Sequence, residues 1–287
     1  MMKIATISRL LLSGMGVVTA LALQLSMPAY GAEKRQLEQL WVTPGLRVPE
    51  SALVYENGKK KHLFVSEIDG KDDDGEGGIA LLSLDGRIVD HDWVRGLNGP
   101  KGMGTHKGRL YVADVKEVVV IDIDAGEIES RIPVKDSVFL NDIAIDNYGV
   151  VYVSDTRTNK VHRIVDGKAE LYLDDIKSPN GLRTIGSTLV VGAGTELLLI
   201  DKDKNRLTLA KGFESNIDGV EMIRPGEFVV SCWVGLVYYV YADGRVEKLL
   251  DTRDAKVNTA DIGYDEETKI VYVPNFHKNT LTAYQLK

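Results

Sequence analysis

A repeat of about 40 residues runs through this chain and limits what it can fold into. Short runs rich in Val, Ile, Leu and Tyr return at that spacing: His62–Ser66, Arg109–Ala113, Val150–Ser154, Thr188–Gly192, Glu227–Ser231 and Ile270–Pro274. Turn signals such as Asp-Gly separate the strand-like runs, and few stretches have helical periodicity. Short strands with frequent turns are typical of sandwiches, barrels and propellers, and a fixed period with several strands per unit favours the propeller.

One repeat unit shows how many strands each blade should contain. Asn141–Asp146, Val150–Asp155 and Lys160–Val165 are predicted as its first three strands, and a fourth follows the turn at Asp166. Six repeat units with this pattern begin near residues 49, 100, 141, 179, 217 and 260. We therefore predict an all-β fold over residues 36–287, a six-bladed β-propeller of four-stranded blades.

The sixth repeat is shorter than the others. Ile270–Val273 and Thr280–Leu286 supply its later strands and the chain then stops, so its outermost strand is missing. Gln36–Thr43, before the first blade, is compatible with a strand. Because an open sheet edge attracts other chains, we expect Gln36–Thr43 to pair with Thr280–Leu286 and close the ring. A frayed terminus is the alternative.

Residues 1–32 have the order of a secretory signal peptide. Lys3 and Arg9 precede an apolar run from Leu10 to Met27, and the small residues of Pro28–Ala32 follow. The run is near the minimum length for a membrane span, so an uncleaved anchor is the alternative. We predict cleavage, a periplasmic or secreted protein, and no stable membrane insertion afterwards.

Charge and cysteine content exclude other classes. The formal charge is −7, and near −9 without Lys3 and Arg9, and there is no basic stripe for nucleic acid. Cys232 is the only cysteine, so no internal disulfide forms, and its strand-like setting predicts a buried thiol rather than a nucleophile. The five histidines lack the paired spacing of zinc ligands.

Polar residues open the first strands of the blades and should meet at the central channel. They are Glu50, Lys101, Asn141, Asn180, Asp218 and Asp261. Each alone is explained as a turn residue, but a purely structural ring would not need three carboxylates, which resist burial without a cation. Lys101 is one candidate cation and a bound metal is the other. Carboxylate and amide oxygens suit hard ions, Ca²⁺ above all, and another divalent ion is also compatible.

The repeat and four short motifs together resemble the gluconolactonase/regucalcin family, with strictosidine synthase and paraoxonase as more distant relatives. The motifs are Pro49-Glu50-Ser51, Asn141-Asp142, Pro179-Asn180-Gly181 and Asp218-Gly219. The resemblance covers essentially the whole chain after the signal. It implies a Ca²⁺-dependent hydrolase of a lactone or related ester, with a small-molecule substrate. It also implies metal ligation by Glu50, Asn180 and Asp218, contact with Asn141 directly or through water and substrate, and Asp218 as general base.

The chain departs from that family at the axis. Gluconolactonases of the regucalcin kind carry an arginine for sugar hydroxyls where this chain has Phe139. Lys101 and Asp261 replace positions that are typically less charged, and with Phe139 and Asn141 they are the predicted substrate-binding residues. Lys101 has three open placements: beside Asp261, on an anionic substrate, or in place of the metal. The last would make the protein a non-catalytic module that binds a protein or small ligand.

Charge balance favours the placement of Lys101 beside Asp261, because Ca²⁺ would match the charges of Glu50 and Asp218 while Lys101 matches that of Asp261.

An acidic loop, Glu67–Gly78, imitates the start of an EF-hand. Its closing position is Ser83 and no helices flank it, so we predict a solvated loop. The end of the propeller that this loop faces stays open.

Overall fold

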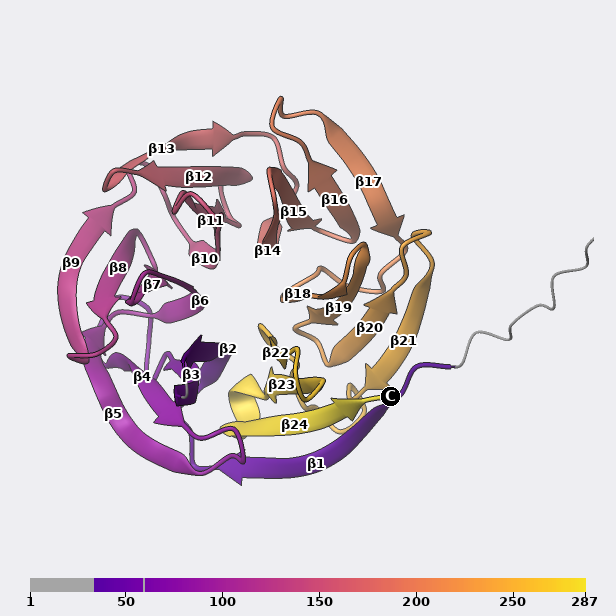
Figure 1. The fold of residues 1–287 in the computed structure, drawn as a ribbon, viewed down its shortest axis with the longest axis horizontal. Helices are drawn as coiled ribbons and strands as arrows, with labels where there is room; N and C mark the ends of the chain where they lie inside the picture. Colours follow the sequence, from indigo (N-terminus) through magenta and orange to yellow (C-terminus); the bar gives the residue numbers. More distant parts are fainter. Residues whose placement is uncertain (1–33, 59) are drawn as a thin grey trace, which may run out of the picture. The chain divides into compact units, whose positions relative to one another are not determined.

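The computed structural model describes residues 34–58 and 60–287, and in this part of the chain the strands form six antiparallel sheets of four. Figure 1 shows the sheets as blades around one axis. The prediction of an all-β, six-bladed propeller is confirmed. The predicted signal peptide lies outside the described residues.

Blades one to five take their strands in chain order, from the axis outward. Blade one comprises β2 (Pro49–Asn57), β3 (Lys60–Glu67), β4 (Gly77–Leu82) and β5 (Ile88–Leu97). Blade two comprises β6 (Pro100–His106), β7 (Arg109–Asp114), β8 (Glu117–Asp122) and β9 (Glu127–Pro133). Blade three comprises β10 (Leu140–Ile145), β11 (Val151–Asp155), β12 (Lys160–Val165) and β13 (Lys168–Leu173).

Blades four and five follow the same order, and blade six takes its outermost strand, β1, from the start of the propeller. Blade four comprises β14 (Pro179–Ile185), β15 (Thr188–Ala193), β16 (Glu196–Ile200) and β17 (Arg206–Lys211). Blade five comprises β18 (Val220–Arg224), β19 (Glu227–Cys232), β20 (Leu236–Val240) and β21 (Val246–Asp251). Blade six comprises β22 (Gly263–Asp265), β23 (Ile270–Pro274), β24 (Thr280–Leu286) and β1 (Leu37–Pro44), with a short 3-10 helix, η1 (Phe276–Lys278), between β23 and β24.

The hydrophobic core lies between the blades rather than at the centre. Each of six buried clusters joins two neighbouring blades, as where Phe64 of blade one meets Val112 of blade two. Middle strands such as β19 and β20 are almost wholly buried, because a blade covers each of their faces. The outer strand β9 is mostly exposed.

The ring closes through both ends of the chain. β1 pairs antiparallel with β24, from Leu37 opposite Leu286 to Pro44 opposite Thr280, and Figure 1 shows β1 outside β24. Gln36 N donates to Lys287 O at 3.2 Å, and Lys287 N donates back to Gln36 O at 3.0 Å. The predicted closing strand is thus confirmed.

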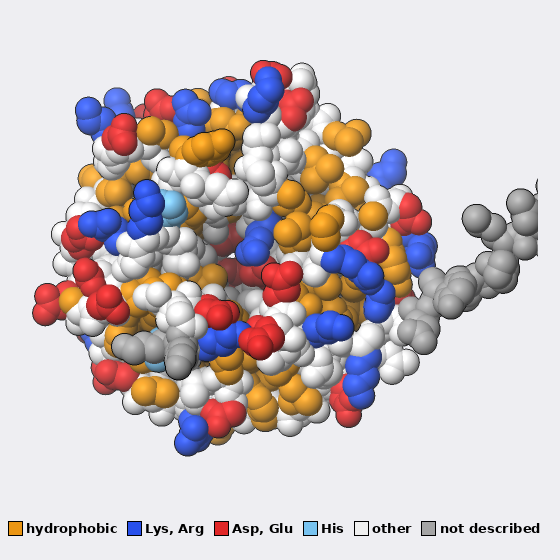
Figure 2. Space-filling view, in the orientation of Figure 1, with side chains coloured by type: hydrophobic (Ala, Val, Ile, Leu, Met, Phe, Trp, Pro, Cys, Tyr) orange, Lys and Arg blue, Asp and Glu red, His pale blue; other side chains and the backbone are white. Residues whose placement is uncertain are grey.

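The centre of the ring is polar. Acidic side chains gather around the central hollow (Figure 2). The carboxyl groups buried there belong to Glu50, Asp142, Asp218, Glu221 and Asp261. None of the helical structure in the described residues is long and apolar enough to cross a membrane.

Candidate functional site

Irregularities at the start of the inner strands turn single side chains toward the axis. In blade one the register between β2 and β3 shifts between Pro49 and Ser51, around Glu50. A bulge of this kind lets one side chain leave the alternation of the strand. The same shift occurs in blades two, three and four, around Lys101, Asn141 and Asn180.

A glycine after the axial residue lets the next blade approach closely. A Cβ atom on Gly181 would lie 2.1 Å from the backbone oxygen of Asp218. A Cβ atom on Gly219 would lie 2.5 Å from the backbone nitrogen of Ile262. The glycines of two sequence motifs are therefore required for packing at the axis.

Buried serines fix the backbone beside three axial residues. The Ser231 hydroxyl accepts a hydrogen bond from Gly219 N at 2.8 Å and donates one to Ala260 O of blade six, also at 2.8 Å. Asp218 N donates to Ser231 O at 2.8 Å. The equivalent serines in blades one and three each accept from an amide at 2.9 Å, and they are Ser66 and Ser154.

A cavity of about 670 Å³ lies at this end of the channel. Glu50, Asn141, Asn180 and Asp218 all line it, as the alignment of blade openings predicts. Lys101 and Phe139 also line it. The sequence interpretation did not place these further lining residues in the site: Asp72, Arg157, Trp233, Phe276 and His277.

Burial perturbs the carboxyl groups of Glu50 and Asp218 in this cavity. Burial raises the pKa of Asp218 to about 7, although a hydrogen bond from Asn180 Nδ2 to Asp218 Oδ1, at 2.8 Å, lowers it. The pKa of Glu50 lies well above its usual value, first because of burial and then because of the charge of Asp218, while Lys101 lowers it. In the absence of a cation, both groups resist ionisation.

The oxygen atoms present fit a hard cation. Glu50 Oε2 and Asn180 Oδ1 are buried and have no hydrogen-bond partner among the described residues. Unsatisfied buried oxygens are costly, and a cation shared with Asp218 would satisfy both. The described residues contain no metal-binding group of three or more His, Cys, Asp or Glu, so such a site would combine two carboxylates with the amides of Asn180 and Asn141.

The expected pairing of Lys101 with Asp261 is wrong. Lys101 Nζ donates to Gly99 O at 2.8 Å and to Asp72 Oδ1 at 3.2 Å, and it lies 4.6 Å from the centre of the Phe139 ring. Asp261 instead accepts a short hydrogen bond from the Ser51 hydroxyl and is not among the described residues that line the cavity. The acidic loop supplies the counter-charge that Asp261 was expected to supply.

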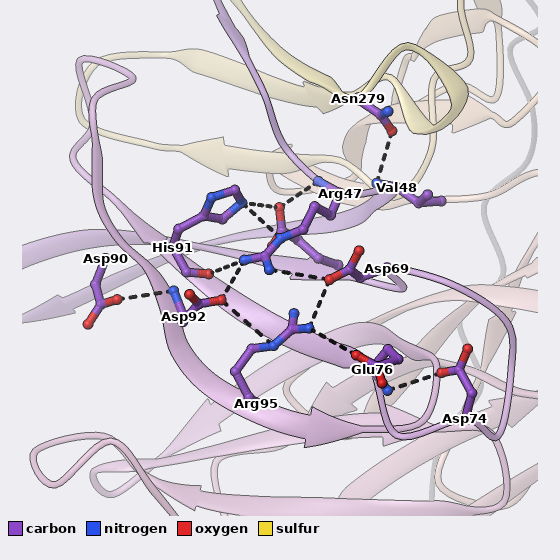
Figure 3. Close-up of polar contacts among 11 residues, drawn as sticks. Arg47, Val48, Asp69, Asp74, Glu76, Asp90, His91, Asp92, Arg95 and Asn279 are labelled. Atoms are coloured by element: carbon purple, nitrogen blue, oxygen red, sulfur yellow. Dashed lines mark hydrogen bonds and ion pairs between the residues drawn. The ribbon is translucent and has the colours of Figure 1, made fainter.

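Ion pairs hold the base of the acidic loop (Figure 3). Buried Glu67 accepts a hydrogen bond from Arg47 N at 2.7 Å, and its Oε1 lies 3.0 Å from His91 Nε2. Asp69 Oδ2 lies 2.8 Å from Arg95 Nη2 and 3.3 Å from Arg47 Nη1. The loop beyond these contacts is exposed, as predicted. The sequence did not indicate which end of the propeller the loop faces; in the structure it lies at the end that holds the cavity and Lys101.

The lining residues that were not predicted share one position in the blade. Asp72, Arg157, Trp233 and Phe276 each lie in the connection between the second and third strands of their blade. In an antiparallel blade this connection lies at the same end as the start of the first strand. The sequence could therefore have indicated these four residues, because the repeat places the connection between the second and third strands of each blade at the mouth of the cavity.

Two contrasting walls border the cavity. The Arg157 guanidinium lies 4.1 Å from the centre of the Phe139 ring. The Trp233 ring lies 5.5 Å from the Phe276 ring, at 75° to it, and 5.5 Å from the His277 ring. Stacked cations and edge-to-face rings of this kind are favourable arrangements.

No family model matches the sequence, and no curated protein matches it. A solved gluconolactonase from Xanthomonas campestris superposes with a TM-score of 0.69 at 17% identity, over 88% of this chain and 89% of that one. A virginiamycin B lyase from Staphylococcus aureus gives 0.65 at 12%, over 88% and 100%. A streptogramin B lyase gives 0.62 at 13%, over 88% and 97%.

At these identities the likeness concerns the fold. Gluconolactonase and both lyases superpose on the same six-bladed ring, with a polar channel at its centre in this chain. The chain is therefore a six-bladed β-propeller that is similar in architecture to these gluconolactonase and lyase structures.

Proposed function

We propose that the protein is an exported Ca²⁺-dependent hydrolase of a lactone or related ester. The observation that carries this proposal is the pair of unsatisfied buried oxygens, Glu50 Oε2 and Asn180 Oδ1, in one cavity with Asp218. Similarity to a gluconolactonase supports a lactone as the substrate class. The charged, apolar and small-residue order of residues 1–32 supports export.

The chain's own residues have defined tasks in this reaction. A bound Ca²⁺ would polarise the carbonyl of the substrate. Asn180 holds one oxygen of Asp218 through its amide nitrogen, so the other oxygen is free to take a proton from water. The water oxygen bonds to the carbonyl carbon, the ester C–O bond breaks, and the proton from Asp218 passes to the leaving oxygen.

Asn141 is held for a complementary task. Its Nδ2 donates to Thr156 Oγ1 at 3.2 Å, and the Thr156 hydroxyl donates to Pro179 O at 2.7 Å. This chain of bonds fixes the amide, with its carbonyl oxygen left for the cation or the substrate. Rigid placement of such groups reduces the cost of ordering them during the reaction.

The alternative is a metal-free binding module in which Lys101 replaces the ion. The position of Lys101 argues against it, because two oxygens, Gly99 O and Asp72 Oδ1, already hold the ammonium group. The unsatisfied oxygens of Glu50 and Asn180 would then keep no partner.

Calorimetry with Ca²⁺ and a screen of lactones and aryl esters test the proposal. Asp218→Asn should lower calcium affinity about a hundredfold or more and abolish hydrolysis, since one substitution removes a ligand charge and the base. Asp243→Asn, an exposed change elsewhere in blade five, is the matched control and should change neither. Lys101→Met should keep calcium affinity within a small factor. Calcium binding by Lys101→Met but not by the unchanged protein would overturn the proposal in favour of the binding module.

A further inference from the structure

A basic wall faces an aromatic wall across the cavity. Phe139 and Arg157 belong to blade three, whereas Phe276 belongs to blade six. Blades three and six lie on opposite sides of the axis (Figure 1). Trp233 of blade five packs on Phe276 and extends the aromatic wall. A ligand in the cavity is therefore met by a cation on one side and by aromatic rings on the other.

Arg157 has no counter-ion within the described part of the chain. Its guanidinium is exposed at the mouth of the cavity, its contact is the face of Phe139, and it makes no hydrogen bond or ion pair with described residues. Stacking on an aromatic face orients the plane of a guanidinium and leaves its N–H groups free to bind a planar anion.

The backbone on both sides of this stack is fixed. Phe139 N donates to Asp155 Oδ1 at 2.9 Å, and Thr156 N donates to Phe139 O at 3.1 Å. The Thr156 hydroxyl ties the same turn to Pro179 O of blade four. Phe139 and Arg157 are thus presented from one rigid corner of blade three, which lowers the cost of ordering Arg157 on binding.

The charges that line the cavity leave Arg157 unmatched. In the proposed function, Ca²⁺ matches Glu50 and Asp218, and the ion pair with Asp72 matches Lys101. One positive charge remains at the mouth, on Arg157. A ligand with one negative charge would complete the balance.

We propose that the substrate carries a carboxylate that pairs with Arg157, and a flat apolar part that lies against Trp233 and Phe276. This inference rests on the proposed function and adds the class of substrate. The volume of about 670 Å³ is within the range of small-molecule sites. Arg157 acts as a specificity-determining residue, while the reacting carbonyl lies over Glu50, Asn180 and Asp218.

A matched pair of esters tests the inference. 4-Acetoxybenzoate carries the carboxylate, and its methyl ester is a neutral molecule of similar shape. The ratio of kcat/KM for the anion to kcat/KM for the neutral ester should fall about tenfold in Arg157→Gln, because a charge-assisted pair is lost at an exposed site. Most of this fall should come from a higher KM for the anion. Arg157→Lys should restore part of the ratio. Intrinsic reactivity cancels, since the ratio is compared between variants.

Arg163→Gln is the charge control, because Arg163 lies in the same blade but pairs with exposed Glu170 outside the cavity. It should leave the ratio unchanged. An equal fall for both esters in Arg157→Gln, or an unchanged ratio, would overturn the inference while leaving the hydrolase intact.

Binding of benzoate and benzamide, measured by calorimetry, separates this inference from the proposed function. We expect benzoate to bind more tightly than benzamide, and Arg157→Gln to remove that preference while calcium affinity is unchanged. If the protein neither binds calcium nor hydrolyses esters, the proposed function fails, and the benzoate preference still decides the role of Arg157. Equal binding of benzoate and benzamide by the unchanged protein would contradict that role.

Discussion

At the residue scale, the main property of the axis is that its carboxyl groups are held in a setting that disfavours charge. Burial raises the pKa of Asp142 to about 8 and that of Asp218 to about 7. The pKa of Asp261 also lies well above its usual value, because of burial and the neighbouring charges of Asp142 and Glu50. The folded chain therefore binds protons that the unfolded chain has released.

A pH dependence of stability follows. A carboxyl group with a raised pKa in the folded state contributes stability below its unfolded pKa, and this contribution is lost as pH rises through the folded pKa. In EDTA, the Tm should therefore fall between about pH 5 and pH 8. The proposed binding of Ca²⁺ predicts an increase in Tm that grows over the same interval, since the cation would bind the deprotonated oxygens.

Differential scanning calorimetry with and without Ca²⁺ checks this dependence. Asp218→Asn should show a shallower fall of Tm in EDTA, because one titrating group has been removed. A Tm in EDTA that is constant or rises from pH 5 to pH 8 would show that these carboxyl groups are not held neutral in the folded protein.

At this scale the sequence predicted part of the site. Glu50, Asn141, Asn180 and Asp218 were found because each opens a repeat unit, and position in a repeat predicts position in space. The partner of Lys101 was not found by that argument. Asp72 lies in the long connection between β3 and β4, and the conformation of this loop depends on contacts, such as those of Glu67 and Asp69, that are distant in sequence.

At the scale of the element, hydrogen bonds between neighbouring blades position the axial residues. Ser231 connects Gly219 of its own blade to Ala260 of the next blade. Ser231→Ala should leave both buried backbone groups unsatisfied and lower the free energy of unfolding by about 2–4 kcal/mol. Ser130→Ala, on the exposed strand β9, is the control and should change it by less than about 0.5 kcal/mol.

Urea denaturation measures both differences. Ser231→Ala should also weaken the proposed calcium binding, because the lost hydroxyl holds the amide of Gly219, next to Asp218. A loss of stability no greater than that of Ser130→Ala would show that the axial turn does not depend on this hydroxyl.

The strands themselves were largely predictable. Residues Val150–Asp155 were expected as a strand and β11 covers Val151–Asp155, since apolar runs between turn signals determine strands of this length. The shifts in register at the start of β2 and β10 were not predicted, because a bulge is set by packing against the adjacent blade rather than by local composition.

At the scale of the whole molecule, the closing strand makes the ring continuous. β1 covers the outer edge of β24, and Trp41 packs against Tyr272 of blade six. Deletion of residues 1–44 should expose that edge, lower the Tm by about 10 °C or more and cause aggregation, because an unpaired strand edge recruits other chains. Deletion of residues 1–34 is the control, since it ends before the closing strand.

Thermal unfolding and static light scattering compare the two deletions. A monomeric product with the same Tm from both deletions would show that β1 adds nothing to the ring. The expectation for the longer deletion rests on sequence and structure alike, because the short sixth repeat already indicated where its missing strand must come from.

The antiparallel pairing of β1 with β24 also constrains the order of assembly. A ribosome releases β1 among the first residues of the propeller and β24 among the last, so these partners meet only when synthesis of the propeller is nearly complete. Five blades can form from local contacts, but the sixth must wait for both ends of the chain. Until then β1 has no partner. Within the propeller, the last strand to be made is thus the one that holds the first in place.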